Sequence, residues 1–171
     1  MLNALSRTIR QTRQHHALEH ATLHMLVRKL PGRRFSGYSD PSGFSIIGRC
    51  TTDELRSAAE EGLRRLQGGE SRLAIHPNCG TLLVTTAVMV TLVALLASPF
   101  LRNKDIGTRF TNLLVLIVPT LILSRPVGYR FQGLTTLADV QDRQIARVYE
   151  MRVGFVTFHR VEFAMNSPMD S

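Results

Sequence analysis

The stretch CGTLLVTTAVMVTLVALLASPFL, residues 79–101, decides the fold class, because its 23 residues include no charged side chain. A helix needs about 20 apolar residues to cross the hydrocarbon core of a bilayer. A buried core helix of such length would be unusual in a chain of 171 residues. The stretch therefore predicts a transmembrane helix.

A second apolar stretch, FTNLLVLIVPTLILS (110–124), follows the polar loop RNKDIGTR (102–109). Its 15 residues are few for a full crossing. The side chains of Arg109 and Arg125 can extend it by snorkelling, and Pro119 would kink it. We expect a transmembrane helical hairpin over residues 77–126, with a re-entrant second segment as the alternative.

The charge distribution indicates the orientation of this hairpin. The segments that flank the two apolar stretches carry 18 Lys and Arg residues, and the loop between the stretches carries three. The positive-inside rule then predicts a two-pass protein of the cell inner membrane with both termini in the cytoplasm. Two cysteines are too few for a disulfide framework, which agrees with reducing surroundings.

The net charge of +8 does not indicate nucleic-acid binding. The basic residues are interspersed with acids and apolar residues, and only 6% of all residues are aromatic. These features argue against a nucleic-acid partner. The expected partners are the lipid bilayer and other membrane protein subunits.

Outside the hairpin the pattern predicts an α+β arrangement. The first part is an N-terminal helix over 3–29 within residues 1–32, followed by a small β-β-α-β unit over 33–76 that looks like an insertion. The elements of that unit are strands at 35–38 and 44–47, a helix over 52–67 capped by Thr51 or Thr52, and a strand at 71–77. After the hairpin, residues 127–165 should form a helix from about Leu137 and a strand over 154–163, and the tail 166–171 should be disordered.

The N-terminal helix contains HHALEH, residues 15–20. His16 and His20 are four residues apart and lie on one helix face, with Glu19 at the edge of that face. The string His16–His20 is H-x-x-E-H, the inverted form of the zinc-protease signature. Two imidazoles would hold zinc, and Glu19 would act as the catalytic base on a water that the metal activates.

A catalytic zinc site needs a third protein ligand. His76 is the best candidate, and Cys79 follows three residues later as a possible fourth, since a thiolate also binds zinc. His24, one turn beyond His20, and His15, which points about 100° away from His16, are expected in supporting roles. The remaining options for a ligand are carboxylates, Glu60, Glu61 and Glu70.

Three motifs, HHALEHAT, IHPNCGTLL and FQGLTT, occur here in this order. They resemble the signatures of the YqhQ-type bacterial membrane proteins, described as predicted metal-dependent enzymes, and the layout also resembles a smaller uncharacterised bacterial family. The resemblance spans about residues 13–145 and departs from the larger family in a longer interval between the first two motifs. It implies site residues at His16, Glu19, His20, His76, Cys79, Gln132, Thr135 and Thr136.

The last three of these residues have two interpretations. Gln132, Thr135 and Thr136 either hydrogen-bond to the ligand cluster and orient its imidazoles, or they serve the local structure. For the two threonines we favour capping of the helix expected from Leu137.

Three functions follow from these motifs. The leading one is a membrane-anchored zinc-dependent hydrolase, for example a peptidase, at the cytoplasmic membrane surface. The alternative is a non-catalytic membrane protein whose structural metal site pins the first helix onto the hairpin, as an accessory or scaffold subunit of a membrane complex. In the third, His16, Glu19 and His20 form a polar network without metal.

Overall fold

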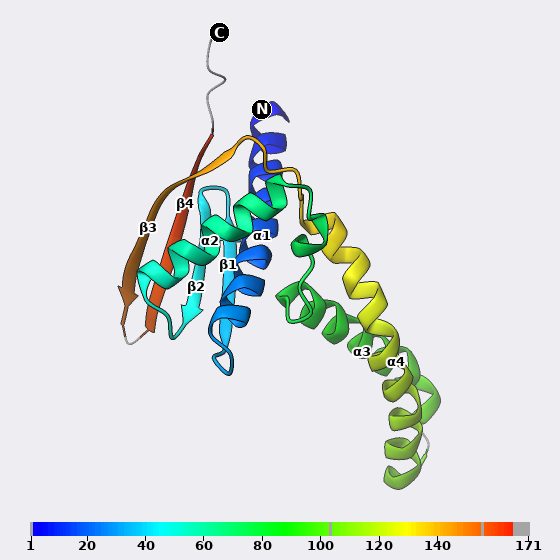
Figure 1. Cartoon of the computed structure of the whole chain (residues 1–171). Coiled ribbons are helices and arrows are strands. Elements are labelled where there is room, and N and C mark those ends of the chain that lie inside the picture. The colour runs from blue at the N-terminus through cyan, green and yellow to red at the C-terminus, as the bar shows by residue number, and fades with distance from the viewer. Residues whose placement is uncertain (1, 103, 155, 166–171) are drawn as a thin grey trace. The chain divides into compact units, whose positions relative to one another are not determined.

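The computed structural model describes residues 2–102, 104–154 and 156–165, and these form two units (Figure 1). The first unit holds the described residues up to His76 and from Thr135 onward, and the second is Pro77–Leu134. In chain order the elements are α1 (Leu2–Lys29), β1 (Phe35–Asp40), β2 (Gly43–Gly48), α2 (Thr52–Gln67), the 3₁₀ helix η1 (Ser71–Ala74), α3 (Gly80–Leu101), α4 (Ile106–Thr135), β3 (Arg143–Val153) and β4 (Val156–Met165).

The first unit is built on one antiparallel sheet with the strand order β1-β2-β4-β3. Helices α1 and α2 pack against one another and against this sheet. Apolar side chains from both chain segments fill the space between helices and sheet, among them Leu18, Leu26, Phe44, Leu55 and Val161. The α+β class is thus confirmed for the described residues.

The expected elements before the hairpin are present except for the last strand. Helix α2 begins with a capping box: Thr51 Oγ1 accepts from the N–H of Glu54 at 3.1 Å, and the Glu54 carboxylate accepts from the N–H of Thr51 at 2.7 Å. Thr51 rather than Thr52 is therefore the cap. The prediction of a strand at 71–77 is wrong, because Ser71–Ala74 forms η1, which packs on α1. The β-β-α-β unit is consequently incomplete, and β4 takes the position beside β2.

The prediction of a helix from Leu137 is also wrong, because the segment leads into β3. The N–H of Leu137 donates to the carbonyl of Arg13 on α1 at 2.9 Å. Further along, Gln14 accepts two hydrogen bonds from the buried guanidinium of Arg143. These tertiary contacts, with the long pairing of β3 to β4, outweigh local helix propensity. Capping of such a helix by Thr135 and Thr136 is accordingly wrong, since Thr135 ends α4.

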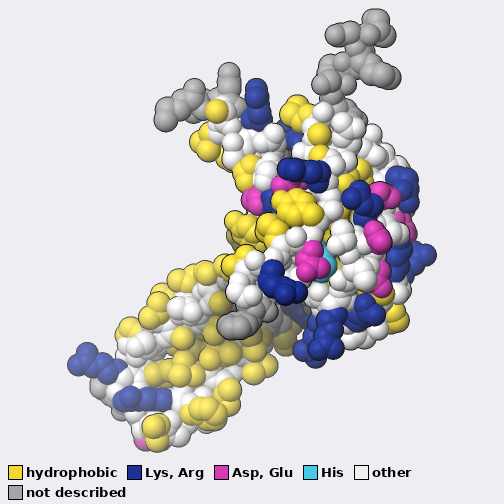
Figure 2. All heavy atoms as spheres, turned by 90° about the vertical axis from the view of Figure 1, so that its left-hand side faces the viewer, with side chains coloured by type: hydrophobic (Ala, Val, Ile, Leu, Met, Phe, Trp, Pro, Cys, Tyr) yellow, Lys and Arg dark blue, Asp and Glu magenta, His cyan; other side chains and the backbone are white. Residues whose placement is uncertain are grey.

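The second unit consists of α3 and α4, and both are long and apolar enough to cross a membrane. Thr86 and Ser124 join them through a hydrogen bond between their hydroxyl groups at 2.8 Å. On the face of the second unit that Figure 2 shows, most side chains are hydrophobic, and Lys and Arg side chains lie at the end of the hairpin. Helix α4 has 30 residues and continues past Arg125, so it is longer than the expected 110–124. The tail expected to be disordered, 166–171, lies outside the described residues.

An ion pair joins the two chain segments of the first unit. Asp40, at the turn between β1 and β2, lies 2.7 Å from the guanidinium of Arg160 on β4, and that guanidinium is nearly inaccessible to solvent. Asp40 also accepts from the N–H and the hydroxyl group of Ser42, each at 2.8 Å. Burial by itself raises the pKa of Asp40, but the hydrogen bonds from Arg160 and Ser42 outweigh it and hold the pKa well below its usual range.

We expect Asp40→Asn to lower the free energy of unfolding by about 3 kcal/mol at pH 7, because it leaves Arg160 buried without its carboxylate. An aspartate has a pKa of about 3.9 in an unfolded chain. Since the folded pKa lies lower, the stabilisation is complete above pH about 4 and is lost as the pH falls toward the folded pKa. Denaturant unfolding of both proteins at pH 7 and pH 3 measures this. An equal difference at the two pH values would contradict the prediction.

Candidate metal-binding site

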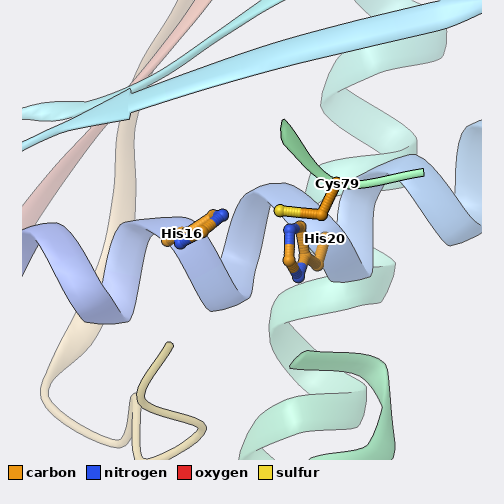
Figure 3. A group of neighbouring side chains, drawn as sticks. All are labelled: His16, His20 and Cys79. Carbon is orange, nitrogen blue, oxygen red and sulfur yellow. The ribbon is translucent and has the colours of Figure 1, made fainter. Parts of the chain in front are cut away.

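Three of the four histidines of α1 lie on one face of the helix, as their spacing predicts. His16, His20 and His24 follow at intervals of four residues, and the rings of His16 and His20 are 4.4 Å apart between centroids. Figure 3 shows these two imidazoles on successive turns of α1, and it also labels Cys79 from the segment that opens α3. The first half of the H-x-x-E-H geometry is therefore present.

His76 comes to this face from the segment after η1. Its ring centroid lies 5.8 Å from that of His20 and 4.7 Å from that of His24. The four imidazoles of His16, His20, His24 and His76 are called the histidine cluster below. Its existence confirms the expected convergence of His76 with the first helix, while the role of each ring as a ligand stays a prediction.

Main-chain carbonyl groups fix the orientation of the rings. His20 Nδ1 lies 2.6 Å from the carbonyl oxygen of Ala74, and His24 Nε2 lies 2.8 Å from that of Ile75. His16 Nδ1 lies 3.2 Å from the carbonyl oxygen of Thr135. Because a carbonyl oxygen only accepts, each of these ring nitrogens carries the proton. In the neutral form of each ring, His16 and His20 therefore have the lone pair on Nε2, whereas His24 has it on Nδ1.

The Nε2 atom of His20 has the environment of a metal ligand. It is buried and has no hydrogen-bond partner among the residues that the structure describes. A buried polar atom without a partner is uncommon in folded proteins. Histidines that bind metals usually donate their other ring N–H to a carbonyl or carboxylate, as His20 does to Ala74.

His76 is neutral at physiological pH. Burial, and then the neighbouring rings of His24 and His20, lower the pKa of His76 to about 4. Only a neutral imidazole binds a metal ion, so His76 needs to lose no proton to become a ligand at pH 7.

Glu19 lies between the histidine face of α1 and β1. It is buried, and its Oε2 accepts a hydrogen bond from the hydroxyl group of Ser39. Burial raises the pKa of Glu19, and the hydrogen bond from Ser39 and the charge of His16 act against this increase. The absence of a side chain at Gly37 makes room for the carboxylate, because a Cβ there would overlap Glu19 Oε1.

The structure does not bring every predicted residue to the cluster. His15 turns to the sheet, where its ring stacks on Phe163 at 5.1 Å and its Nδ1 lies 2.9 Å from the carbonyl oxygen of Asp40. Glu61 pairs with Lys29 at 2.9 Å, and Glu70 pairs with Arg65 at 2.6 Å. These two carboxylates are engaged in ion pairs away from the histidines.

After the hairpin, Thr135 and Thr136 supply main-chain carbonyl groups that accept hydrogen bonds from side chains of α1. The carbonyl of Thr135 accepts from His16, and that of Thr136 accepts from Arg13 at 3.2 Å. Gln132 and Cys79 belong to the second unit. There Cys79 is the N-cap of α3, and its sulfur accepts from the N–H of Thr81 at 3.4 Å.

Sequence reasoning missed the groups that hold the site residues in place. The carbonyls of Ala74 and Ile75 orient two imidazoles, and a carbonyl has no signature in a sequence. Gly37 lies in the strand predicted at 35–38 and Ser39 directly follows it, but the pattern does not show which residue faces Glu19. Such groups emerge only when α1, β1 and η1 pack together.

Comparisons with known proteins give a family without an assigned activity. The family model described as Domain of unknown function (DUF6391) matches residues 11–148. A protein of Picosynechococcus sp. described as uncharacterized is 36% identical over 86 residues, which cover 45% of this chain and 42% of that protein. The chain thus spans less than half the length of this relative. No solved structure matches the chain.

The contact between Glu19 and Gly37 can be tested by a double-mutant cycle. Gly37→Ala should lower the free energy of unfolding by about 1–3 kcal/mol, the usual cost of overpacking. In a Glu19→Ala background the same change should be nearly neutral, because the carboxylate that the new methyl group meets is gone. Thermal unfolding of the four proteins measures the coupling. Equal losses in both backgrounds would show that Gly37 does not make room for Glu19.

Proposed function

Because this chain belongs to the family described as Domain of unknown function (DUF6391), whose name assigns no activity, we propose a function from the chemistry of its histidine cluster. The protein is, in this proposal, a membrane-anchored zinc-dependent hydrolase. The observation that carries it is the buried Nε2 of His20, which has no partner among the described residues while Nδ1 of the same ring donates to the carbonyl of Ala74.

His16, His20 and His76 would hold the metal. The first two have Nε2 lone pairs, because their Nδ1 atoms donate to carbonyl groups, and the third is neutral at pH 7. Cys79 follows His76 by three residues, so the chain limits the distance between their Cα atoms to about 10 Å, and its thiolate is the proposed fourth ligand. Nitrogen and sulfur ligands of this kind suit zinc.

Glu19 is the proposed general base. Its Oε2 is held by Ser39, which leaves Oε1 to receive the proton of an attacking water. Burial raises the pKa of Glu19, which is the direction required of a carboxyl group that takes and returns a proton. Zinc, when bound, supplies Lewis-acid polarisation of the carbonyl group and acidification of water.

The covalent connection of the cluster to the apolar hairpin supports a site at a membrane surface. The chain leaves the first unit after His76 and returns to it at Thr135. His76 contacts His20 and His24, and the Thr135 carbonyl contacts His16. The chain therefore enters the hairpin directly after His76 and leaves it directly before Thr135, two residues that contact α1 histidines. The proposed substrates are amides or esters, peptides among them, presented at the cytoplasmic face of the inner membrane, with both termini of this two-pass chain on that face.

A structural metal site is the second candidate, and burial favours it. His20 is fully buried and Glu19 is only 5% exposed. Four protein ligands that include Cys79 would leave no open position, as in structural zinc sites. In this alternative the metal fixes the first helix to the start of the hairpin, and the protein is an accessory or scaffold subunit of a membrane complex. The similarity to YqhQ-type enzymes stays an expectation from three motifs.

Removing a ligand should remove the metal. We expect the purified full chain, loaded with zinc and dialysed, to retain about one zinc ion per chain, and His20→Ala and His76→Ala to lose most of it. His15→Gln is the matched control, because His15 adjoins His16 in sequence but packs on the sheet, and it should retain the metal. Elemental analysis by mass spectrometry measures the content. Full retention in His20→Ala would exclude the proposed site.

Glu19→Gln separates the two candidate functions. For a general base we expect hydrolysis of fluorogenic peptides or p-nitrophenyl esters to fall by about 10²–10⁴-fold while zinc content stays the same. Glu70→Gln is the control and should leave turnover unchanged, because its carboxylate pairs with Arg65 away from the histidines. A Glu19→Gln protein with unaltered turnover would contradict the catalytic role. Absence of turnover in the zinc-loaded wild type would favour the structural site.

A further inference from the structure

A second feature of the first unit, independent of the zinc proposal, lies where α1 ends and the β1–β2 hairpin opens. Phe35 of β1 pairs with Gly48 of β2 at the open end of this antiparallel ladder. Arg34 comes directly before β1 and Arg49 directly after β2, so both lie at this end of the hairpin. Arg33 joins them, because its Nη1 donates to the carbonyl of Arg49 at 2.8 Å.

These three arginines line a hollow of about 490 Å³ at this end of the sheet. The hollow is open to solvent on one side and is also lined by Ile47, Val156 and Thr157. Ile47 is 41% exposed and Val156 is 44% exposed. The hollow therefore combines guanidinium groups with accessible apolar side chains.

The positive charge of the hollow is only partly compensated within the chain. Arg34 and Arg49 form no ion pair or side-chain hydrogen bond with any described residue. Arg33 lies 3.6 Å from Glu54, but that carboxylate also accepts from the capping residue Thr51. Like charges that line one hollow repel one another. A bound anion would relieve the repulsion among these three guanidinium groups.

We propose that this hollow binds a phosphate group. The fork of a guanidinium group matches phosphate oxygens and donates two parallel hydrogen bonds to them. A phosphate is supplied either by an anionic phospholipid headgroup or by free phosphate. The exposed Ile47 and Val156 beside the arginines favour the headgroup, whose glycerol and acyl carbons would contact them.

The test uses the full chain in a neutral maltoside detergent. The protein is titrated with short-chain phosphatidylglycerol, with phosphatidylcholine of equal chain length, and with inorganic phosphate, and binding is followed by thermophoresis. We expect saturable binding of phosphatidylglycerol that weakens at least tenfold in Arg34→Gln/Arg49→Gln. The matched control, Arg64→Gln/Arg72→Gln, removes the same charge from exposed positions and should bind like the wild type.

Thermal unfolding gives a second measurement. Without ligand, Arg34→Gln/Arg49→Gln should melt at or above the wild-type temperature, because the repulsion is gone, and phosphatidylglycerol should stabilise only the wild type and the control. Binding of inorganic phosphate at similar strength would support the site and identify free phosphate as the ligand. Equal weakening in both double variants, or equal affinity for phosphatidylcholine, would overturn the proposal.

Discussion

The hydrogen bond between His20 and the carbonyl of Ala74 is the interaction on which the candidate site depends. It ties the first helix to η1, the last element before the apolar hairpin. It also sets the tautomer of His20, so that the lone pair lies on the buried Nε2. His24 forms a similar hydrogen bond to the next carbonyl group, that of Ile75. Together the two bonds hold the segment that precedes His76 against α1.

The first unit is assembled from two segments that the hairpin separates in the sequence. Its sheet takes β1 and β2 from before the hairpin and β3 and β4 from after it. Buried polar contacts join the two segments: Asp40 with Arg160, and Gln14 with Arg143. Since these groups are charged or polar and largely withdrawn from water, each needs its partner, and the pairing specifies how the segments meet. The same assembly brings the carbonyl of Thr135 to His16.

The elements that were predicted correctly are those whose signal is local. Helix α2 has an apolar face and a capping box, and the β1–β2 hairpin has the turn residues Asp40 to Gly43 between two apolar runs. The errors are at 71–77 and from Leu137 onward. In both places a main-chain group forms a hydrogen bond with α1 instead of one within a local strand or helix. The carbonyl of Ala74 bonds to His20, and the N–H of Leu137 bonds to the carbonyl of Arg13. A short stretch of sequence does not show which tertiary hydrogen bonds will compete with its local ones.

The sequence by itself determined that His16, His20 and Glu19 share one side of a helix, because 3.6 residues per turn leaves no other arrangement. It also determined that two stretches are apolar enough to cross a bilayer, because length and composition suffice for that. Only the tertiary structure decided that His20 Nε2 is buried without a partner among the described residues, that Ser39 donates to Glu19 beside Gly37, and that Arg34 and Arg49 line one hollow. Each of these depends on segments distant in the chain, whose meeting is set by the packing of the whole first unit.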